Sequence, residues 1–270
     1  MIAEDRRAVL PEYDHVLFAR PPLRLVIAQV RFPVLLRFGD SAFLAPFQDA
    51  IRAEYPRLSR EDQVAFQVSP KGVQQSAGEQ QWRFASRDGD WALVLSENAL
   101  TIESRKYSSD ADLLERFARA LTAASDHLNV TERVRLGLRY INEFRLDGMF
   151  TLADWGIILR PEFVGFAATN LFDGDVERMV QEVRVQQPNG SLDIRHGLLT
   201  GTIVDPPPEN PPANGRFYFL DLDYYDGSEL ELDIGGTIDR LREYNHVLYR
   251  FFRWTLTEQM FHELEPVNAR

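Results

Sequence analysis

Two stretches of this chain share one order of elements, in which strands lead into a long helix. The first runs from strands around Trp82 to Glu103 into a helix from Asp110 to about Asp126. The second runs from an acidic strand, Tyr218 to Asp226, into a helix with an apolar stripe from about Ile238 to His262. Apolar residues spaced three and four apart predict the helices, and alternation predicts the strands. The repeated order predicts a duplicated α+β unit.

A long strand opens each predicted unit. Arg24 to Phe38 is rich in Val, Ile, Leu and Phe, and Pro33 within it predicts a bend, a bulge or an edge position, because proline cannot donate to the ladder. Arg133 to Leu146 opens the second unit. Helical spacing also predicts helices from Ser41 to Tyr55 and over Thr151 to Ile158. The remaining predicted strands are Val64 to Val68, Trp82 to Ala85, Trp91 to Leu95, Ala99 to Ser104, Val176 to Gln186, Ser191 to Ile203 and Arg216 to Tyr225.

These elements predict an α+β fold of duplicated strand-helix-strands-helix units. We expect one curved, mainly antiparallel sheet with long helices packed on one face, as in helix-grip or TATA-binding-protein-like folds. Residues 1–20 are then an N-terminal extension, and residues 21–130 and 131–265 form two halves packed as one domain. Residue identity between the halves is poor, so the duplication rests on element order. Asp205 to Gly215 contains five prolines in eleven residues and predicts an extended surface loop.

Composition excludes several classes of protein. The net charge of −11 repels nucleic acid and anionic membranes, so we expect neither as a partner. Cysteine is absent, which removes disulfides, thiolate metal sites and cysteine nucleophiles. Residues 1–9 carry charges and no apolar run of signal-peptide length, and no segment reaches the roughly 20 apolar residues that span a bilayer. We therefore expect an acidic, cytoplasmic protein.

Three segments together resemble a family of conserved bacterial proteins. They are Pro21-Pro22-Leu23 with Gln29 to Pro33, Gly137 to Asn142, and Leu241 to Met260 with its aromatic-rich Phe251-Phe252-Arg253-Trp254-Thr255. The family is similar in length to this chain, is distributed sporadically among bacteria and has no established activity. The resemblance implies a bacterial protein and suits an accessory protein of a defence-type locus, and it transfers no catalytic residues.

No catalytic motif stands out. The five histidines are scattered, with no pair at helical ligand spacing, and neither a nucleophile-elbow sequence nor a Gly-rich phosphate loop is present. We expect no catalytic residue and no cofactor. The run Asp221, Asp223, Asp226 invites a divalent cation, because hard cations prefer carboxylate oxygens. Its spacing does not match an EF-hand, and the alternative is a strand face that is exposed to solvent. We therefore predict no metal ligand, although the sequence alone does not decide whether these three carboxylates bind a cation.

The arginines of the two long strands are the candidate binding residues. Arg133, Arg135 and Arg139 share one face by two-residue periodicity, and Arg31 on the first strand alternates with Val30 and Phe32. If duplication relates the strands, these arginines converge on a concave sheet and bind an anionic ligand or an acidic partner strand. The alternative is that they pair with the Asp and Glu of the same sheet. The predicted ligand- or partner-binding residues are Arg31, Arg135, Arg139 and Asn142.

From these observations we expect a non-enzymatic binding or protein-interaction module that engages another protein or a second copy of itself. The alternative is an enzyme that binds a small anionic ligand, or hydrolyses it, in a cavity between sheet and helix. In that alternative Arg31, Arg139 and Asn142 hold the anion.

Overall fold

The computed structural model describes residues 10–69, 72–149, 151–169, 171, 173–212 and 214–267. The fold is mixed α+β, and its centre is a nine-stranded sheet in the order β3-β4-β5-β6-β2-β8-β11-β10-β9. Every neighbouring pair in that sheet is antiparallel. Its strands are β2 (Leu23–Arg31), β3 (Arg57–Ser69), β4 (Gly72–Ala85), β5 (Trp91–Ser96), β6 (Ala99–Ser104), β8 (Arg135–Phe144), β9 (Met179–Gln187), β10 (Gly190–Thr200) and β11 (Arg216–Asp226).

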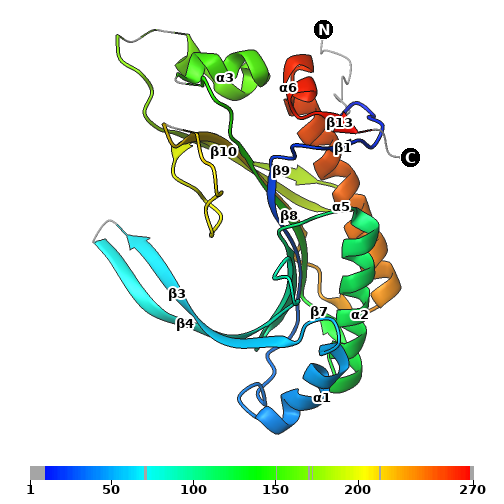
Figure 1. The fold of residues 1–270 in the computed structure, drawn as a ribbon. Helices are drawn as coiled ribbons and strands as arrows, with labels where there is room; N and C mark the ends of the chain where they lie inside the picture. Colours follow the sequence, from blue (N-terminus) through cyan, green and yellow to red (C-terminus); the bar gives the residue numbers. More distant parts are fainter. Residues whose placement is uncertain are drawn as a thin grey trace, which may run out of the picture.

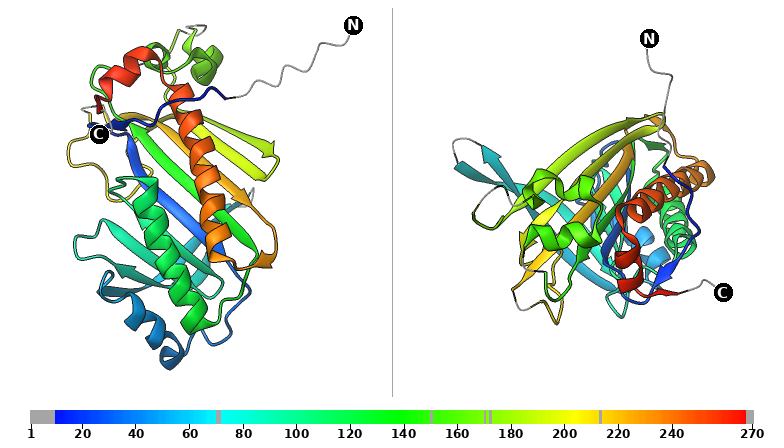
Figure 2. Two further views of the ribbon diagram at one scale, coloured as in Figure 1. Left: turned by 90° about the vertical axis from the view of Figure 1, so that its right-hand side faces the viewer. Right: turned by 90° about the horizontal axis from the view of Figure 1, so that it is seen from above.

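The sheet is strongly curved, and its long helices lie along the convex side while the concave side stays open (Figure 1). Figure 2 shows the two longest helices, α2 and α5, side by side across the strands. Two small strand pairs, β1 with β13 and β7 with β12, flank the main sheet. The helices are α1 (Ser41–Ile51), α2 (Asp110–Leu128), α3 (Leu152–Ile158), α4 (Pro161–Val164), α5 (Ile234–Thr255), α6 (Glu258–Glu263) and the 3-10 turn η1 (Gly165–Ala168); the short strands are β1 (Leu17–Phe18), β7 (Glu132–Arg133), β12 (Leu230–Glu231) and β13 (Pro266–Val267).

Alternation along the central strands separates the two faces of the sheet. On β8, Leu136 and Leu138 are fully buried and join one hydrophobic cluster with Val26 and Val30 of β2 and the apolar stripes of α2 and α5. The residues between them point to the concave side. Because side chains alternate along a strand, this face carries the polar residues of the same strands.

Local signals at the helix ends agree with the prediction for α2. The Ser109 side chain accepts a hydrogen bond from the Asp112 amide at 3.2 Å, as an N-cap does. The helix ends at Asn129, whose φ of 56° is the left-handed conformation that Asn tolerates. A capping box of Thr151 and Asp154 likewise starts α3 where it was predicted.

Two predicted boundaries are wrong. The first strand, predicted to reach Phe38, ends at Arg31, and turns follow before α1. The long terminal helix, predicted to run unbroken to His262, breaks at Leu256, whose extended backbone forms an isolated bridge with Leu159. Thr257 then caps α6 by accepting from the Met260 amide at 3.3 Å.

The proline-rich loop has no helix or strand among its described residues, as predicted. It lies over the concave side (Figure 1, yellow). Arg24 donates to the Pro206 carbonyl at 3.0 Å, and Arg105 donates to the Asp205 carbonyl at 2.6 Å. Glu143, whose side chain is fully buried, accepts from the Ile203 amide at 2.8 Å. The loop therefore closes one end of the concave side. None of the helices in the described part of the chain combines the length and the apolarity that crossing a bilayer requires.

Candidate functional site: an arginine-lined groove on the concave face

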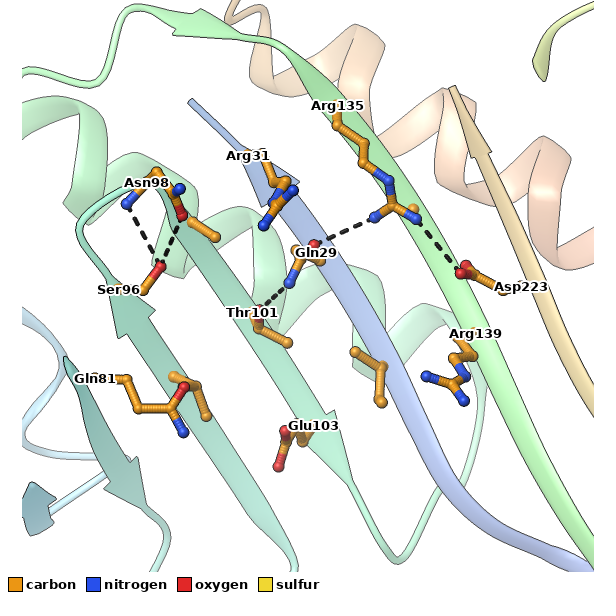
Figure 3. A pocket seen from close by; sticks show the side chains of 14 residues that line it. Gln29, Arg31, Gln81, Ser96, Asn98, Thr101, Glu103, Arg135, Arg139 and Asp223 are labelled. Atoms are coloured by element: carbon orange, nitrogen blue, oxygen red, sulfur yellow. Dashed lines mark hydrogen bonds and ion pairs between the residues drawn. The ribbon is translucent and has the colours of Figure 1, made fainter. Parts of the chain in front are cut away.

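A hollow of about 410 Å³ lies on the concave face of the central strands, and we call it the concave groove. Figure 3 shows its side chains rising from β2, β5, β6, β8 and β11. Most are polar, and three of the predicted arginines are among them. The lining residues are Ile27, Gln29, Arg31, Gln81, Val94, Ser96, Asn98, Ala99, Thr101, Glu103, Arg135, Gly137, Arg139 and Asp223.

The register of β2 and β8 brings the arginines together. These two strands are neighbours in the middle of the sheet, and Arg31 is the direct partner of Arg135. Two residues further along β8, Gly137 is opposite Gln29, and Arg139 is opposite Ile27. Because side chains of the same parity share a face, Arg31, Arg135 and Arg139 all project into the concave groove.

Arg135 is held by its neighbours. It donates to the Gln29 Oε1 at 3.2 Å and to the Asp223 Oδ2 at 3.4 Å, and its guanidinium carbon lies 4.6 Å from the centre of the Tyr225 ring. Its side chain folds over Gly137, where a Cβ would stand only 2.9 Å from the Arg135 Nη1. Glycine at this position therefore leaves room for the guanidinium.

Arg139 makes the tightest ion pair of the groove. Its Nε and Nη2 each donate to an Asp221 oxygen at 2.7 Å, and Arg195 of β10 donates to the same carboxylate. The hydrogen bond to Asp221 raises the pKa of Arg139 above its usual value. The Asp221 side chain is only 3 % exposed, so this pair is a buried bidentate contact. Arg135 and Arg139 therefore pair with carboxylates of the same sheet, which is the alternative that the sequence left open.

Arg31 differs from the other two. It is exposed at the end of β2, and within the described residues it has neither a hydrogen bond nor an ion pair from its side chain. Like charges directly opposite on paired strands repel each other. The Arg31 and Arg135 pair therefore leaves an excess of positive charge in the concave groove, of which Asp223 offsets only a part.

The acidic run of β11 divides between the two faces. Asp221 and Asp223 face the groove and its arginines, whereas Asp226 lies on the helix side, where it accepts from Arg133 at 2.9 Å and from the Tyr244 hydroxyl at 2.6 Å. Burial raises the pKa of Asp223 above its usual range. Across the described ranges, no group of three or more His, Asp or Glu side chains is placed to hold a metal ion.

Asn142 does not belong to the groove. It is three residues from Arg139, so alternation places it on the helix side, where its side chain is buried and its Nδ2 donates to the Leu220 carbonyl at 3.1 Å. The four predicted residues therefore do not form one site. In the enzymatic alternative, Arg31, Arg139 and Asn142 together bind the anion. They cannot do so in this structure, because Asn142 lies on the opposite face of the sheet. Arg133, expected on the face of Arg135, pairs with Asp226 on the helix side instead.

A row of polar side chains in the groove was not among the predicted binding residues. Thr101 accepts from the Gln29 Nε2 at 3.0 Å, and Ser96 donates to the Asn98 Oδ1 at 3.1 Å. Glu103 pairs with Arg83 at 2.8 Å. The alternation of polar residues along Ala99 to Ser104 was the available signal, since Thr101 and Glu103 share parity.

Compared with known proteins, the chain gives no match to a protein-family model, to a curated protein or to a solved structure.

Proposed function

We propose that this protein is a non-enzymatic binding module whose concave groove receives an acidic polypeptide segment of a partner protein. The observation that carries the proposal is the opposed pair of Arg31 and Arg135, of which Arg31 has no counter-ion in the described part of the chain. A carboxylate placed between the two guanidinium groups relieves their repulsion and gains charge-assisted hydrogen bonds.

The other groove residues favour a polypeptide over a nucleic acid. Glu103 and Asp223 stand in the same groove as hydrogen-bond acceptors, and a phosphate backbone has no donor to offer them. A polypeptide brings N–H donors as well as acceptors. Its backbone suits a surface that mixes acceptors with donors such as the side-chain amides of Gln29, Gln81 and Asn98.

We also infer that the two halves arose by duplication. In each half a central strand is followed by helix, further strands and a long helix, and the two central strands β2 and β8 pair antiparallel in the middle of the sheet. Such a pairing suits two units related by a twofold axis between β2 and β8. With its helices on the convex side and its concave side open, the arrangement is nearer to the TATA-binding-protein-like expectation than to the helix-grip one.

The test uses three labelled probes in fluorescence anisotropy: an eight-residue peptide of alternating Glu and Ser, the same peptide with Lys in place of Glu, and a single-stranded DNA of eight nucleotides. The proposal expects the Glu peptide alone to bind. Binding should weaken at least tenfold in Arg31→Ala and fall with added salt. Light scattering on the purified protein shows whether two copies associate in solution.

Arg52→Ala is the matched control, because Arg52 is an exposed arginine at the C-terminal end of α1, pairs with Asp49 at 3.7 Å and does not line the groove. It should bind the Glu peptide as the unchanged protein does. Preference for DNA, or equal loss in both arginine variants, contradicts the proposal.

A further inference from the structure

A second cavity lies on the other side of the sheet, between β8 and α5. Its volume is about 220 Å³, and its lining is mainly apolar and aromatic. Residues after β6 and the segment before β1 close it; the Val16 amide of that segment donates to the Tyr249 hydroxyl at 2.8 Å. The lining residues are His15, Val16, Leu17, Phe18, Pro21, Pro22, Leu23, Arg105, Lys106, Tyr107, Tyr140, Asn142, Asn245, Tyr249 and Phe252.

A break in the sheet register lies beside this cavity. The pairing of β2 with β8 shifts between Leu23 and Leu25, so that Leu23 is opposite Asn142 while Leu25 is opposite Ile141. The extra residue, Arg24, turns to the concave side, where its side chain bonds the Pro206 carbonyl. Leu23 and Asn142, which the bulge sets opposite each other, both line the cavity.

Two buried amides in the cavity wall each lack one hydrogen-bond partner. Asn142 is 3 % exposed and uses its Nδ2 on the Leu220 carbonyl, and Asn245 is 9 % exposed and accepts at its Oδ1 from the Tyr140 hydroxyl at 2.6 Å. Within the described residues, the Asn142 Oδ1 and the Asn245 Nδ2 have no hydrogen-bond partner. Both residues line the cavity and neither of these two atoms is fully buried, so a ligand or ordered water in the cavity can pair with the free acceptor and the free donor.

The tyrosine hydroxyls around these amides already have hydrogen-bond partners. Because the single hydrogen of the Tyr140 hydroxyl goes to Asn245, the Tyr107 hydroxyl, 3.2 Å away, donates to Tyr140. Burial raises the pKa values of both tyrosines, so both stay neutral. The charged residues at the rim are exposed to water: Arg105 donates to a backbone carbonyl, that of Asp205, and Lys106 lies 3.6 Å from Asp90. A charged group inside the cavity would lose its hydration against a mainly apolar wall.

We propose that this cavity binds a small flat aromatic molecule bearing an uncharged group that both donates and accepts, such as a primary carboxamide. The Asn245 Nδ2 donates to its carbonyl, and the Asn142 Oδ1 accepts from its NH₂. The rings of Tyr107, Tyr140, Tyr249 and Phe252 contact its aromatic ring. An apolar cavity of about 150 Å³ holds benzene, so 220 Å³ accommodates a ring with a carboxamide.

The test measures binding of benzamide, benzoate and toluene to the full chain by saturation-transfer NMR and titration calorimetry. Benzamide should bind with a Kd of about 1 mM or tighter, and both toluene and benzoate at least fivefold more weakly. Toluene lacks the polar group, and benzoate brings a charge that the mainly apolar wall desolvates. No benzamide binding at 10 mM (roughly ten times that Kd), or equal binding of benzamide and toluene, overturns the proposal.

Two variants separate recognition from folding. Asn245→Leu removes the free donor and should abolish the preference for benzamide over toluene while toluene still binds; Asn245→Ser is the smaller change if the first unfolds. Arg31→Ala, in the concave groove on the opposite face, should leave benzamide binding unchanged. An unchanged preference for benzamide over toluene in both Asn245 variants, or loss of benzamide binding in Arg31→Ala, contradicts this assignment. Because the two sites lie on opposite faces, either proposal can fail while the other stands.

Discussion

Arg31 on β2 and Arg135 on β8 are direct register partners at the centre of the sheet, and of the two only Arg135 has a carboxylate to pair with among the described residues. Two guanidinium groups held opposite each other cost folding energy unless an anion lies between them. Binding of an anionic partner removes this repulsion, so its energetic cost in the free protein adds to the favourable free energy of binding.

Arg31→Ala should therefore raise the free energy of unfolding slightly, by at most about 0.5 kcal/mol, while it weakens binding of the Glu peptide. Urea unfolding at low salt measures the first effect. The gain should shrink as salt screens the repulsion, because Arg31 is exposed. A loss of stability in this variant would show that Arg31 has a structural partner instead.

We expect Arg139 to contribute more to the stability of the fold than to peptide binding. Arg139→Ala leaves the buried Asp221 with Arg195 alone and should lower the free energy of unfolding by about 2 kcal/mol. Arg139→Lys should recover only part of this, since lysine cannot make the bidentate contact. Urea denaturation checks both, and Arg52→Ala serves as the neutral reference. Unchanged stability with lost peptide binding would assign Arg139 to the binding surface.

Asp223 limits the positive charge of the groove. Since burial raises its pKa, its charged form is disfavoured in the folded protein, and its contribution to stability declines as pH rises from 3.8 through the raised pKa. Asp223→Asn should therefore keep or improve stability at pH 7 and tighten binding of the Glu peptide several-fold. Anisotropy and thermal melts measure the two effects. Asp49→Asn, a surface change of equal charge, should alter neither; weaker peptide binding in Asp223→Asn would contradict the proposed role of the groove.

Glu143 attaches the proline-rich loop to the sheet. Its fully buried carboxylate lies 2.9 Å from Arg145 and 3.5 Å from Arg24, and it accepts from the Thr202 hydroxyl at 2.8 Å. Glu143→Gln removes the charge and should cost about 3 kcal/mol of unfolding free energy. It should also speed cleavage after Glu209 by a glutamate-specific protease. Glu265→Gln, a surface pair with Arg20, is the control and should cleave at the unchanged rate.

His196 makes folding sensitive to acid. It is 5 % exposed, its Nδ1 lies 2.7 Å from the Tyr218 hydroxyl, and burial lowers its pKa to about 4. The unfolded chain takes up a proton below about 6.5, whereas the folded one resists it, so stability is full above 6.5 and falls as pH drops toward 4.

The loss should be about 1 kcal/mol per pH unit in that window, measured by urea unfolding at pH 7 and pH 5. His196→Gln should flatten the slope, and His127→Gln, at an exposed position, should not. An equal slope in both variants would assign the acid sensitivity to other groups.

Local patterns in the sequence determined the elements and the faces of the strands. The stripe of α2 and its Ser109 cap predicted that helix, and two-residue alternation placed Arg135 and Arg139 on one face. The same alternation already excluded Asn142 from that face, because an odd spacing from Arg139 reverses the side. The break at Leu256 could not be predicted, because it depends on the bridge to Leu159, which is far away in the chain.

The tertiary structure alone decided which strands are neighbours, and therefore which charges pair. Alternation fixes the side of a strand on which Arg31 lies, but only the pairing of β2 with β8 sets it opposite Arg135, and only the pairing of β8 with β11 gives Arg139 its carboxylate. Strand pairing joins residues about 100 positions apart and depends on the packing of the whole core. The local sequence pattern predicts the alternation of side chains along each strand, but it does not predict the register between two strands.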